Sequence, residues 1–255
     1  MSPEQTIEHL DDFNLKGMAA VFRRHVSQVP RADMDAETLV AQMVDAQRMM
    51  RHEQRLTSRL KQARFKEIAQ PDQIDWKHAR GLRKQEMLQV LAGTWVQNGQ
   101  NLLITGPTGL GKTFLACAIG HRLCQDGRTV TFRRATRLFD ELISARGDGS
   151  YAQRLRKLMA TDVLVLDDFA LEPMNADARH DLLEIMEDRY GIKSTIITSQ
   201  FEPDHWHTAV GAPTHADSIL DRLVHNALRI QLQGESIRKT RGKAAALTTE
   251  KTQGK

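Results

Sequence analysis

A glycine-rich stretch that ends in a lysine and a threonine carries the clearest chemistry in this sequence. Such a stretch fits the phosphate-binding loop (P-loop), whose glycines let the backbone curl so that its N–H groups point at phosphates. Lys112 would reach the β- and γ-phosphates of a nucleotide, and Thr113 would offer its hydroxyl to Mg²⁺. The predicted ATP-binding residues are Gly106, Pro107, Thr108, Gly109, Leu110, Gly111, Lys112 and Thr113.

A second motif is an apolar run, Val163 to Leu166, that ends in two carboxylates. Burying an isolated charge is costly, so acidic residues at the end of such a strand have a cation or polar ligand to meet. Asp167 is therefore predicted to hold Mg²⁺ together with Thr113, and Asp168 to act as the general base that polarises water. In isolation the motif could also be a strand-ending turn, but the upstream P-loop argues against that alternative.

Two further residues are candidates for the hydrolytic step. Gln200, at the end of an apolar run from residue 194, would hydrogen-bond the γ-phosphate or the attacking water. Ser199 is the second choice, and a plain turn or capping role for either residue stays open. Arg222 could act as an arginine finger in the site of a neighbouring subunit. The alternative for Arg222 is a local ion pair with Asp221 or Glu235.

The periodicity of apolar residues indicates which elements must position these groups. Residues 1 to about 66 read as all-helical, with a third and longest helix from about Ala36 to Ala63. From residue 85 onward, strand-like runs alternate with helical stretches, which predicts an α/β domain whose parallel sheet is covered on both faces, a three-layer arrangement. The expected strands are Asn101–Thr105, Thr129–Phe132, Val163–Asp167, Thr195–Ser199 and Leu228–Leu232. The P-loop then lies at a strand-to-helix turn.

Charge is segregated along the chain although the net charge is only +4. Residues 48–66 carry seven basic side chains and one acidic side chain, and residues 238–255 carry six and one. Such segregation favours a polyanionic partner. On the third helix, Arg48, Arg51, Arg55 and Arg59 are spaced by three or four residues, so they form one basic stripe that suits a DNA backbone. A solvated helix face is the alternative interpretation.

Composition excludes several classes of protein. No apolar run approaches the roughly 18 residues that span a bilayer, so we expect a cytoplasmic protein with no membrane partner. The two cysteines, Cys117 and Cys124, are too few for a disulfide framework and are expected to share one face of the helix after the P-loop. No Asn-Lys-x-Asp motif for guanine recognition occurs, which disfavours a GTPase, and neither an acceptor site nor a basic lid indicates a small-molecule kinase.

Taken together, these motifs resemble the IstB-like transposition helpers of insertion sequences, an AAA+ ATPase family related to the DnaC helicase loaders. The resemblance runs from near residue 36 to about residue 240. The matching segments are Lys61–Phe65, the P-loop, Val163–Asp168, Ser194–Gln200, Ile219–Leu223 and Gly234–Arg238. It implies an AAA+ domain, and an ATP-dependent homo-oligomer that binds and deforms double-stranded DNA, recruits the transposase of the same insertion sequence, and couples hydrolysis to its release.

Periodicity and composition predict a division of the chain, and the sequence departs from the family pattern at two places. We expect a helical DNA- or partner-binding domain at 1–66, a linker at 67–84, the AAA+ domain at 85–240 and a mobile basic tail at 241–255. The family has Asp-Glu where this chain has Asp167-Asp168, so hydrolysis is expected to be slow. The Gly106–Leu110 turn also replaces the more usual Gly-Pro-Pro-Gly-Thr. A DnaC-like helicase loader and a non-hydrolysing DNA scaffold remain the rival interpretations.

Overall fold

The structure is a computed structural model that describes residues 2–27 and 34–237. It divides into two compact units, Met1–Ser58 and Arg59–Lys255. The division falls inside the long third helix, before the expected end of the helical domain at residue 66. The expected basic tail at 241–255 lies outside the described residues.

The first unit contains α1 (Pro3–Asp12), α2 (Lys16–Ser27) and most of α3 (Ala36–Ala63). Ser2 begins α1 with a capping box that it forms with Gln5. The backbone of α2 lies against α3 at Gly17, whose N–H donates to the Gln47 side chain at 2.8 Å. An added Cβ at Gly17 would lie 2.7 Å from the Cα of Gln47, so this close approach requires glycine.

The second unit is built on a sheet of five parallel strands, as the sequence predicts. The strand order is β2-β3-β4-β1-β5, and all neighbouring pairs are parallel. The strands are β1 (Asn101–Thr105), β2 (Val130–Arg134), β3 (Val163–Phe169), β4 (Ser194–Ser199) and β5 (Ala227–Gln231). The P-loop and the paired carboxylates therefore lie on the same side of the sheet, at the carboxyl ends of its parallel strands.

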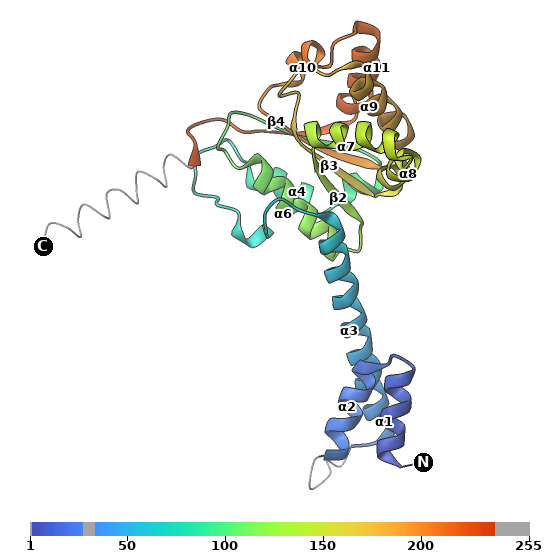
Figure 1. Cartoon of the computed structure of the whole chain (residues 1–255). Coiled ribbons are helices and arrows are strands. Elements are labelled where there is room, and N and C mark those ends of the chain that lie inside the picture. The colour runs from blue at the N-terminus through green and yellow to red at the C-terminus, as the bar shows by residue number, and fades with distance from the viewer. Residues whose placement is uncertain (1, 28–33, 238–255) are drawn as a thin grey trace, which may run out of the picture. The chain divides into compact units, whose positions relative to one another are not determined.

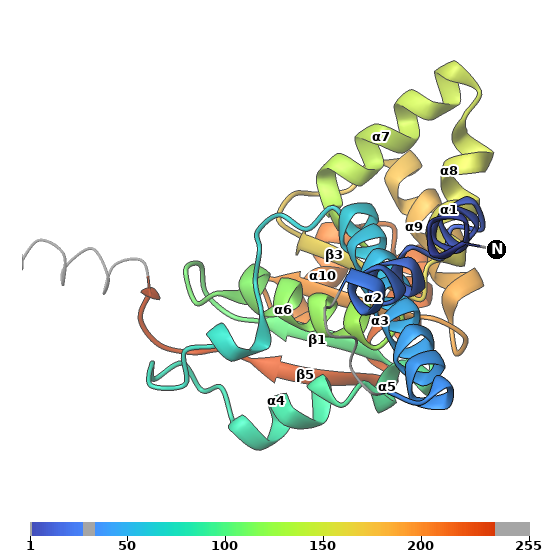
Figure 2. The ribbon, with the colours of Figure 1, turned by 90° about the horizontal axis from the view of Figure 1, so that it is seen from below.

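Helices cover both faces of this sheet, which confirms the three-layer α/β class. Figures 1 and 2 show α6 on one side of the sheet and α7, α8 and α9 on the other. Leu103, Leu164 and Leu166 face the second group of helices, and their neighbours along the strands are buried on the α6 side. The remaining elements are η1 (Pro71–Gln73), α4 (Lys84–Leu91), α5 (Thr94–Gln97), α6 (Lys112–Gln125), α7 (Ala135–Asp148), α8 (Tyr151–Ala160), α9 (Ala176–Arg189), α10 (Pro203–Val210) and α11 (Pro213–Val224).

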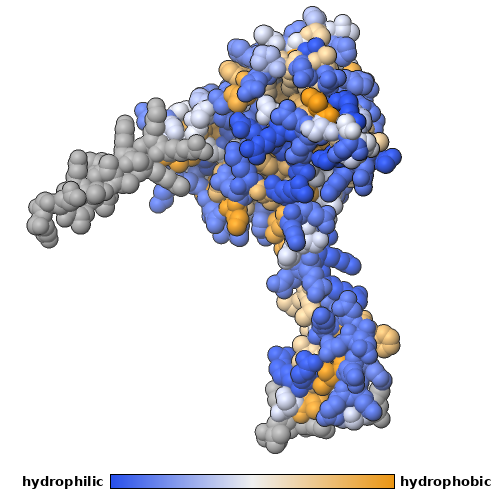
Figure 3. Space-filling model, viewed as in Figure 1, coloured by the Kyte–Doolittle hydropathy of each residue, from blue (hydrophilic) through white to orange (hydrophobic). Residues whose placement is uncertain are grey.

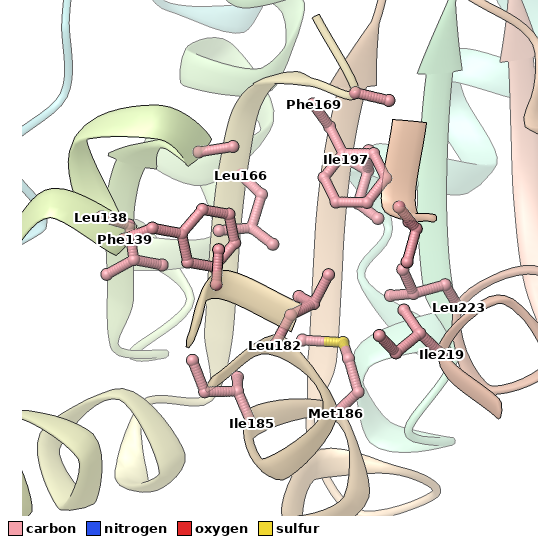
Figure 4. Packing of buried hydrophobic residues seen from close by; sticks show 14 of the residues in the cluster. Leu138, Phe139, Leu166, Phe169, Leu182, Ile185, Met186, Ile197, Ile219 and Leu223 are labelled. Atoms are coloured by element: carbon pink, nitrogen blue, oxygen red, sulfur yellow. The ribbon is translucent and has the colours of Figure 1, made fainter. Parts of the chain in front are cut away.

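A cluster of buried hydrophobic residues holds the ends of β3 and β4 in place. It joins Leu166 and Ile197 of the sheet to side chains of α7, α9 and α11 (Figure 4). Phe169, the last residue of β3, packs edge-on against Trp206 with ring centroids 4.9 Å apart. Full burial of each such side chain contributes about 1.5–3 kcal/mol. The carboxylates that precede Phe169 are thus fixed by a well-packed anchor.

The segment expected to be a linker is packed onto the second unit instead of connecting two units freely. Ala69, Ile74 and Arg80 are all at most 3% exposed. Just before it, the Phe65 ring lies where a Cβ on Gly120 of α6 would stand. Within the described ranges, no helix has both the length and the apolar character needed to cross a bilayer.

Candidate active site

The P-loop connects the carboxyl end of β1 to the amino end of α6. Gly111 caps α6 with a φ of 83°, and Gly106 has a φ of 133°. A Cβ on Gly106 would overlap the carbonyl oxygen of Leu232, so the loop can run this close to the segment after β5 only with glycine there. The free N–H groups at the start of α6 make this turn an anion site.

Lys112 lies inside the curl of that loop. Its Nζ donates to the carbonyl oxygens of Gly106 at 2.6 Å and of Pro107 at 2.9 Å. Burial lowers the pKa of Lys112, and the nearby carboxylates of Asp168 and Asp167 act in the opposite direction. The ammonium group is therefore held where phosphate oxygens would meet it.

Asp167 is the buried acid of the site, with a side chain that is 0% exposed. It accepts hydrogen bonds from the hydroxyls of Thr113 at 2.8 Å and Thr198 at 2.6 Å. The Nζ of Lys66 lies 3.5 Å from its other oxygen. This ammonium supplies the positive charge that a buried carboxylate requires.

The hydroxyl of Thr113 and the carboxylate of Asp167 fit a Mg²⁺ ion. Magnesium is bound by one or two carboxylates together with the phosphates of a substrate, not by a cage of protein ligands. The described part of the chain holds no group of three or more His, Cys, Asp or Glu side chains that could hold a metal. Hard oxygen donors next to the P-loop are the ligands that this ion prefers.

Asp168 reaches the site because β3 is irregular at this point. The register between β3 and β4 shifts between Leu166 and Phe169, and Asp168 has a φ of 56°, which an aspartate tolerates better than most residues do. Its N–H donates to the hydroxyl of Thr198 at 3.1 Å. Without this bulge, Asp167 and Asp168 would point to opposite faces of the sheet.

Arg134 is a site residue that the sequence analysis missed. Its Nε lies 3.1 Å from a carboxylate oxygen of Asp168. Arg134 ends β2, the strand next to β3, and stands in register with Asp167. The signal that could have identified it is its position at the end of a strand, since the carboxyl ends of parallel strands share one edge.

The cavity at this edge has a volume of about 360 Å³ and brings most of the predicted residues together. Gln200 lines it, whereas the predicted second choice, Ser199, does not. The Ser199 hydroxyl is buried and bonded to the carbonyl of Phe169 and the indole of Trp206, which is a structural role. The cavity lining is Lys66, Glu67, Gln73, Asp75, Arg80, Thr108, Gly109, Gly111, Lys112, Thr113, Phe114, Asp168, Gln200 and Ile237.

Arg80 is a second site residue that the sequence analysis missed, and no evident sequence signal points to it. Its guanidinium donates to the carbonyls of Leu110 at 2.8 Å and Asp75 at 3.2 Å. Burial lowers the pKa of Arg80, with the carboxylate of Asp75 opposing the shift. On the other side of the loop, the N–H of Ile237 donates to the carbonyl of Gly109 at 3.0 Å. Segments far apart in sequence thus hold the P-loop from both sides.

Arg222 lies away from the cavity of its own chain. Its carbonyl accepts a hydrogen bond from Asn101, the first residue of β1, whereas the P-loop follows the last residue of that strand. A five-residue strand separates the two ends by about 13 Å. The guanidinium pairs with Glu187 at 3.0 Å, so neither of the local partners considered from the sequence, Asp221 or Glu235, is the one observed.

The four arginines of the predicted stripe differ in their surroundings. Arg51 and Arg55 are exposed, and neither forms an ion pair with another described residue, while Arg48 pairs with Asp45 at 3.3 Å. Arg59 is only partly exposed, and its guanidinium lies 3.5 Å from the carbonyl of Cys124 at the end of α6. Arg59 belongs to the second unit, whereas the other three belong to the first.

Comparison with known proteins agrees with this geometry. The model of the IstB-like ATP binding protein family matches residues 8–245. The chain belongs to this family. An insertion sequence ATP-binding protein of Sinorhizobium fredii is 44% identical over 94% of this chain and 98% of its own length. A second one from the same organism is 40% identical over 97% of this chain and its whole length.

Solved structures share the fold of this IstB-like chain. The helicase loader DnaC aligns with a TM-score of 0.51 and 23% identity over 62% of this chain and 95% of its own. DnaI aligns with a TM-score of 0.55 and 21% identity over 69% and 94%. At this level of identity they show the AAA+ fold, and the function must be argued from the site.

Proposed function

We propose that this protein is a Mg²⁺-dependent ATPase that acts as an IstB-like transposition helper. In this role it forms a homo-oligomer on double-stranded DNA, and it recruits and regulates the transposase of its own insertion sequence. One observation carries the ATPase part: Lys112, Asp168 and Gln200 converge on a single cavity beside the buried Asp167. The insertion-sequence names of the relatives favour a transposition helper over the rival DnaC-like helicase loader.

The proposed site residues have distinct tasks in hydrolysis. The P-loop amides and Lys112 bind the phosphates and neutralise charge that develops in the transition state. Thr113 and Asp167 would hold Mg²⁺, which would supply further charge neutralisation on the phosphates when bound. Asp168 takes a proton from the attacking water, and Gln200 orients that water. The guanidinium of Arg134, 3.1 Å from a carboxylate oxygen of Asp168, holds that carboxylate in place beside the cavity.

Arg222 supports the oligomeric part of the proposal. It cannot serve the cavity of its own chain, because it lies at the amino end of β1 and the cavity lies at the carboxyl ends of the strands. A second copy could receive this guanidinium at its γ-phosphate, where such a cation stabilises the transition state. Assembly would then be a condition for turnover.

The basic stripe on α3 supports DNA binding. Arg51 and Arg55 are exposed and lie one helical turn apart, so they present two adjacent cations. Contacts to phosphates release counterions, and this makes the affinity depend on salt with a slope of about 0.9 per contact. Arg48 adds a third cation on the same side of the helix.

Replacing Arg51 and Arg55 by glutamine in the full-length chain tests this function. We expect the slope of log K for duplex DNA against log salt to fall by roughly 1.8. The matched control, Lys16→Gln with Arg24→Gln, removes two exposed cations from the same unit and should keep the slope. An unchanged slope for the stripe variant would contradict the DNA contact. Absence of both DNA binding and DNA-stimulated phosphate release in the unaltered chain would refute the function itself.

A further inference from the structure

Strand β2 forms one edge of the sheet, and two hollows run along it. Among the described strands β2 pairs only with β3, so its other side has no strand neighbour. One hollow has a volume of about 160 Å³ and the other about 170 Å³. Both are lined by Thr131 and Lys157, so the two hollows are neighbours. We call the two hollows together the edge groove, and its basic residues are Arg59, Arg64, Arg133, Arg154 and Lys157.

The edge groove carries an excess of positive charge. Its five cations face a single acidic residue, Glu141. Arg133 is largely buried, with a side chain that is 16% exposed and 3.5 Å from Glu141. Burial lowers the pKa of Arg133; Glu141 counteracts this, while Arg64 and Arg154 lower the pKa further. The single negative charge of Glu141 therefore does not neutralise the positive charge of the surrounding basic side chains.

Three of these five cations, Arg59, Arg64 and Lys157, form no ion pair with any residue in the described ranges. Of these three, Arg64 and Lys157 are exposed. Arg154 makes only a long contact to Asp148, at 3.7 Å. A concave surface with low-dielectric walls focuses the field of such charges and attracts anions.

The shape of the edge groove selects the kind of anion. Each hollow has less than half the volume of the ATP cavity, at about 160 and 170 Å³ against about 360 Å³. A whole nucleotide is therefore a poor fit, but a single phosphate group is a good one. The repetition of two basic hollows along one strand matches a backbone of successive phosphates. The visible face of this unit is mostly hydrophilic, with only small hydrophobic spots (Figure 3).

We propose that the edge groove is a second contact surface for the phosphate backbone of duplex DNA, located on the ATPase unit. This inference rests on the proposed function, which assigns DNA contacts only to the arginine stripe. Arg59, predicted as part of that stripe, contributes to the edge groove instead. DNA bound here lies against β2, the strand that also ends in the Asp168 partner Arg134.

The test replaces Arg64 and Lys157 by glutamine in the full-length chain. Binding of duplex DNA is followed by fluorescence anisotropy at 50 to 200 mM salt, with Mg²⁺ and a non-hydrolysable ATP analogue. Two lost phosphate contacts should lower the slope of log K against log salt by roughly 1.8 and weaken binding for every DNA sequence alike. Arg64 has a positive φ of 55°, so a second test leaves it unchanged and alters Lys157 alone. Lys157→Glu should weaken DNA binding further than Lys157→Gln does.

The matched control is Lys84→Gln with Arg229→Gln. Both residues are exposed, and Arg229 lies on β5 at the opposite edge of the sheet. The control removes the same charge and should keep the slope. An edge-groove variant that behaves like this control overturns the inference. If the edge-groove variant keeps the slope while the Arg51/Arg55 variant lowers it, the edge-groove inference fails and the proposed function survives. If the unaltered chain binds no DNA, the inference and the proposed function both fail.

Discussion

Replacing Asp168 by asparagine separates ATP binding from ATP hydrolysis in this site. Asparagine has the size of aspartate and also tolerates the φ of 56° at this position, so the β3 bulge should persist. The N–H of residue 168 can still donate to Thr198, a bond that does not depend on the side chain. What the variant lacks is the carboxylate that accepts a proton from water and pairs with Arg134.

The size of the effect follows from the role of the carboxylate. A positioned general base contributes about 10²- to 10⁴-fold to a rate, which corresponds to about 2.7–5.4 kcal/mol of transition-state stabilisation. Binding of Mg²⁺-ATP should change by less than about tenfold, because the P-loop, Thr113 and Asp167 are unaltered. The melting temperature should change little, since the lost ion pair joins side chains that are 42% and 20% exposed.

The assay combines phosphate release, with and without duplex DNA, and binding of a fluorescent ATP analogue. Asp177→Asn, at an exposed position in the first turn of α9, is the matched control and should hydrolyse ATP like the unaltered chain. A loss of less than tenfold in turnover, with nucleotide binding intact, would refute the assignment of Asp168 as the base. Asp168→Glu adds the methylene that the family usually has, and faster turnover would show that reach limits this site.

Two further predictions address assembly and pH. Arg222→Ala should leave ATP binding by the isolated chain intact, yet it should lower turnover by about 10³-fold or more at concentrations where the protein assembles. The control, Glu187→Gln, removes only the ion-pair partner of Arg222 and should keep turnover. Equal turnover rates for the unaltered chain and both variants would rule out the arginine finger. Burial raises the pKa values of Cys117 and Cys124 to about 11, so the folded chain retains protons that the unfolded chain loses above pH 9. The melting temperature should therefore fall more steeply between pH 9 and 11 for the unaltered chain than for the Cys117→Ala/Cys124→Ala variant, and parallel curves would contradict this.

Local sequence patterns determined much of the fold. All five strands lie where the apolar runs predicted them, and the long helix spans Ala36–Ala63 as expected. Apolar periodicity reports which residues are buried, and burial dominates the choice of secondary structure. The P-loop was predictable for the same reason, because its function depends on consecutive residues that share one turn.

Some predictions from local pattern were incomplete for a physical reason. The apolar stripe of α3 indicated a helix, yet Val40 and Val44 are 54% and 52% exposed. The packed segment after residue 66 was interpreted as a linker, because it contains Pro71 and alternates Asp with Ile or Trp residues. Periodicity reveals an amphipathic element but does not reveal how much of its apolar face another element covers.

By itself, then, the sequence determined the chemistry of the phosphate cradle and the two acids, since these motifs are contiguous. Only the tertiary structure decided their partners: Arg134 beside Asp168, Arg80 behind Leu110, and Lys66 beside Asp167. These pairs depend on the order of strands in the sheet and on where chain segments cross. Many compatible packings share the same periodicity, so contacts of this kind are fixed only when the whole core is assembled.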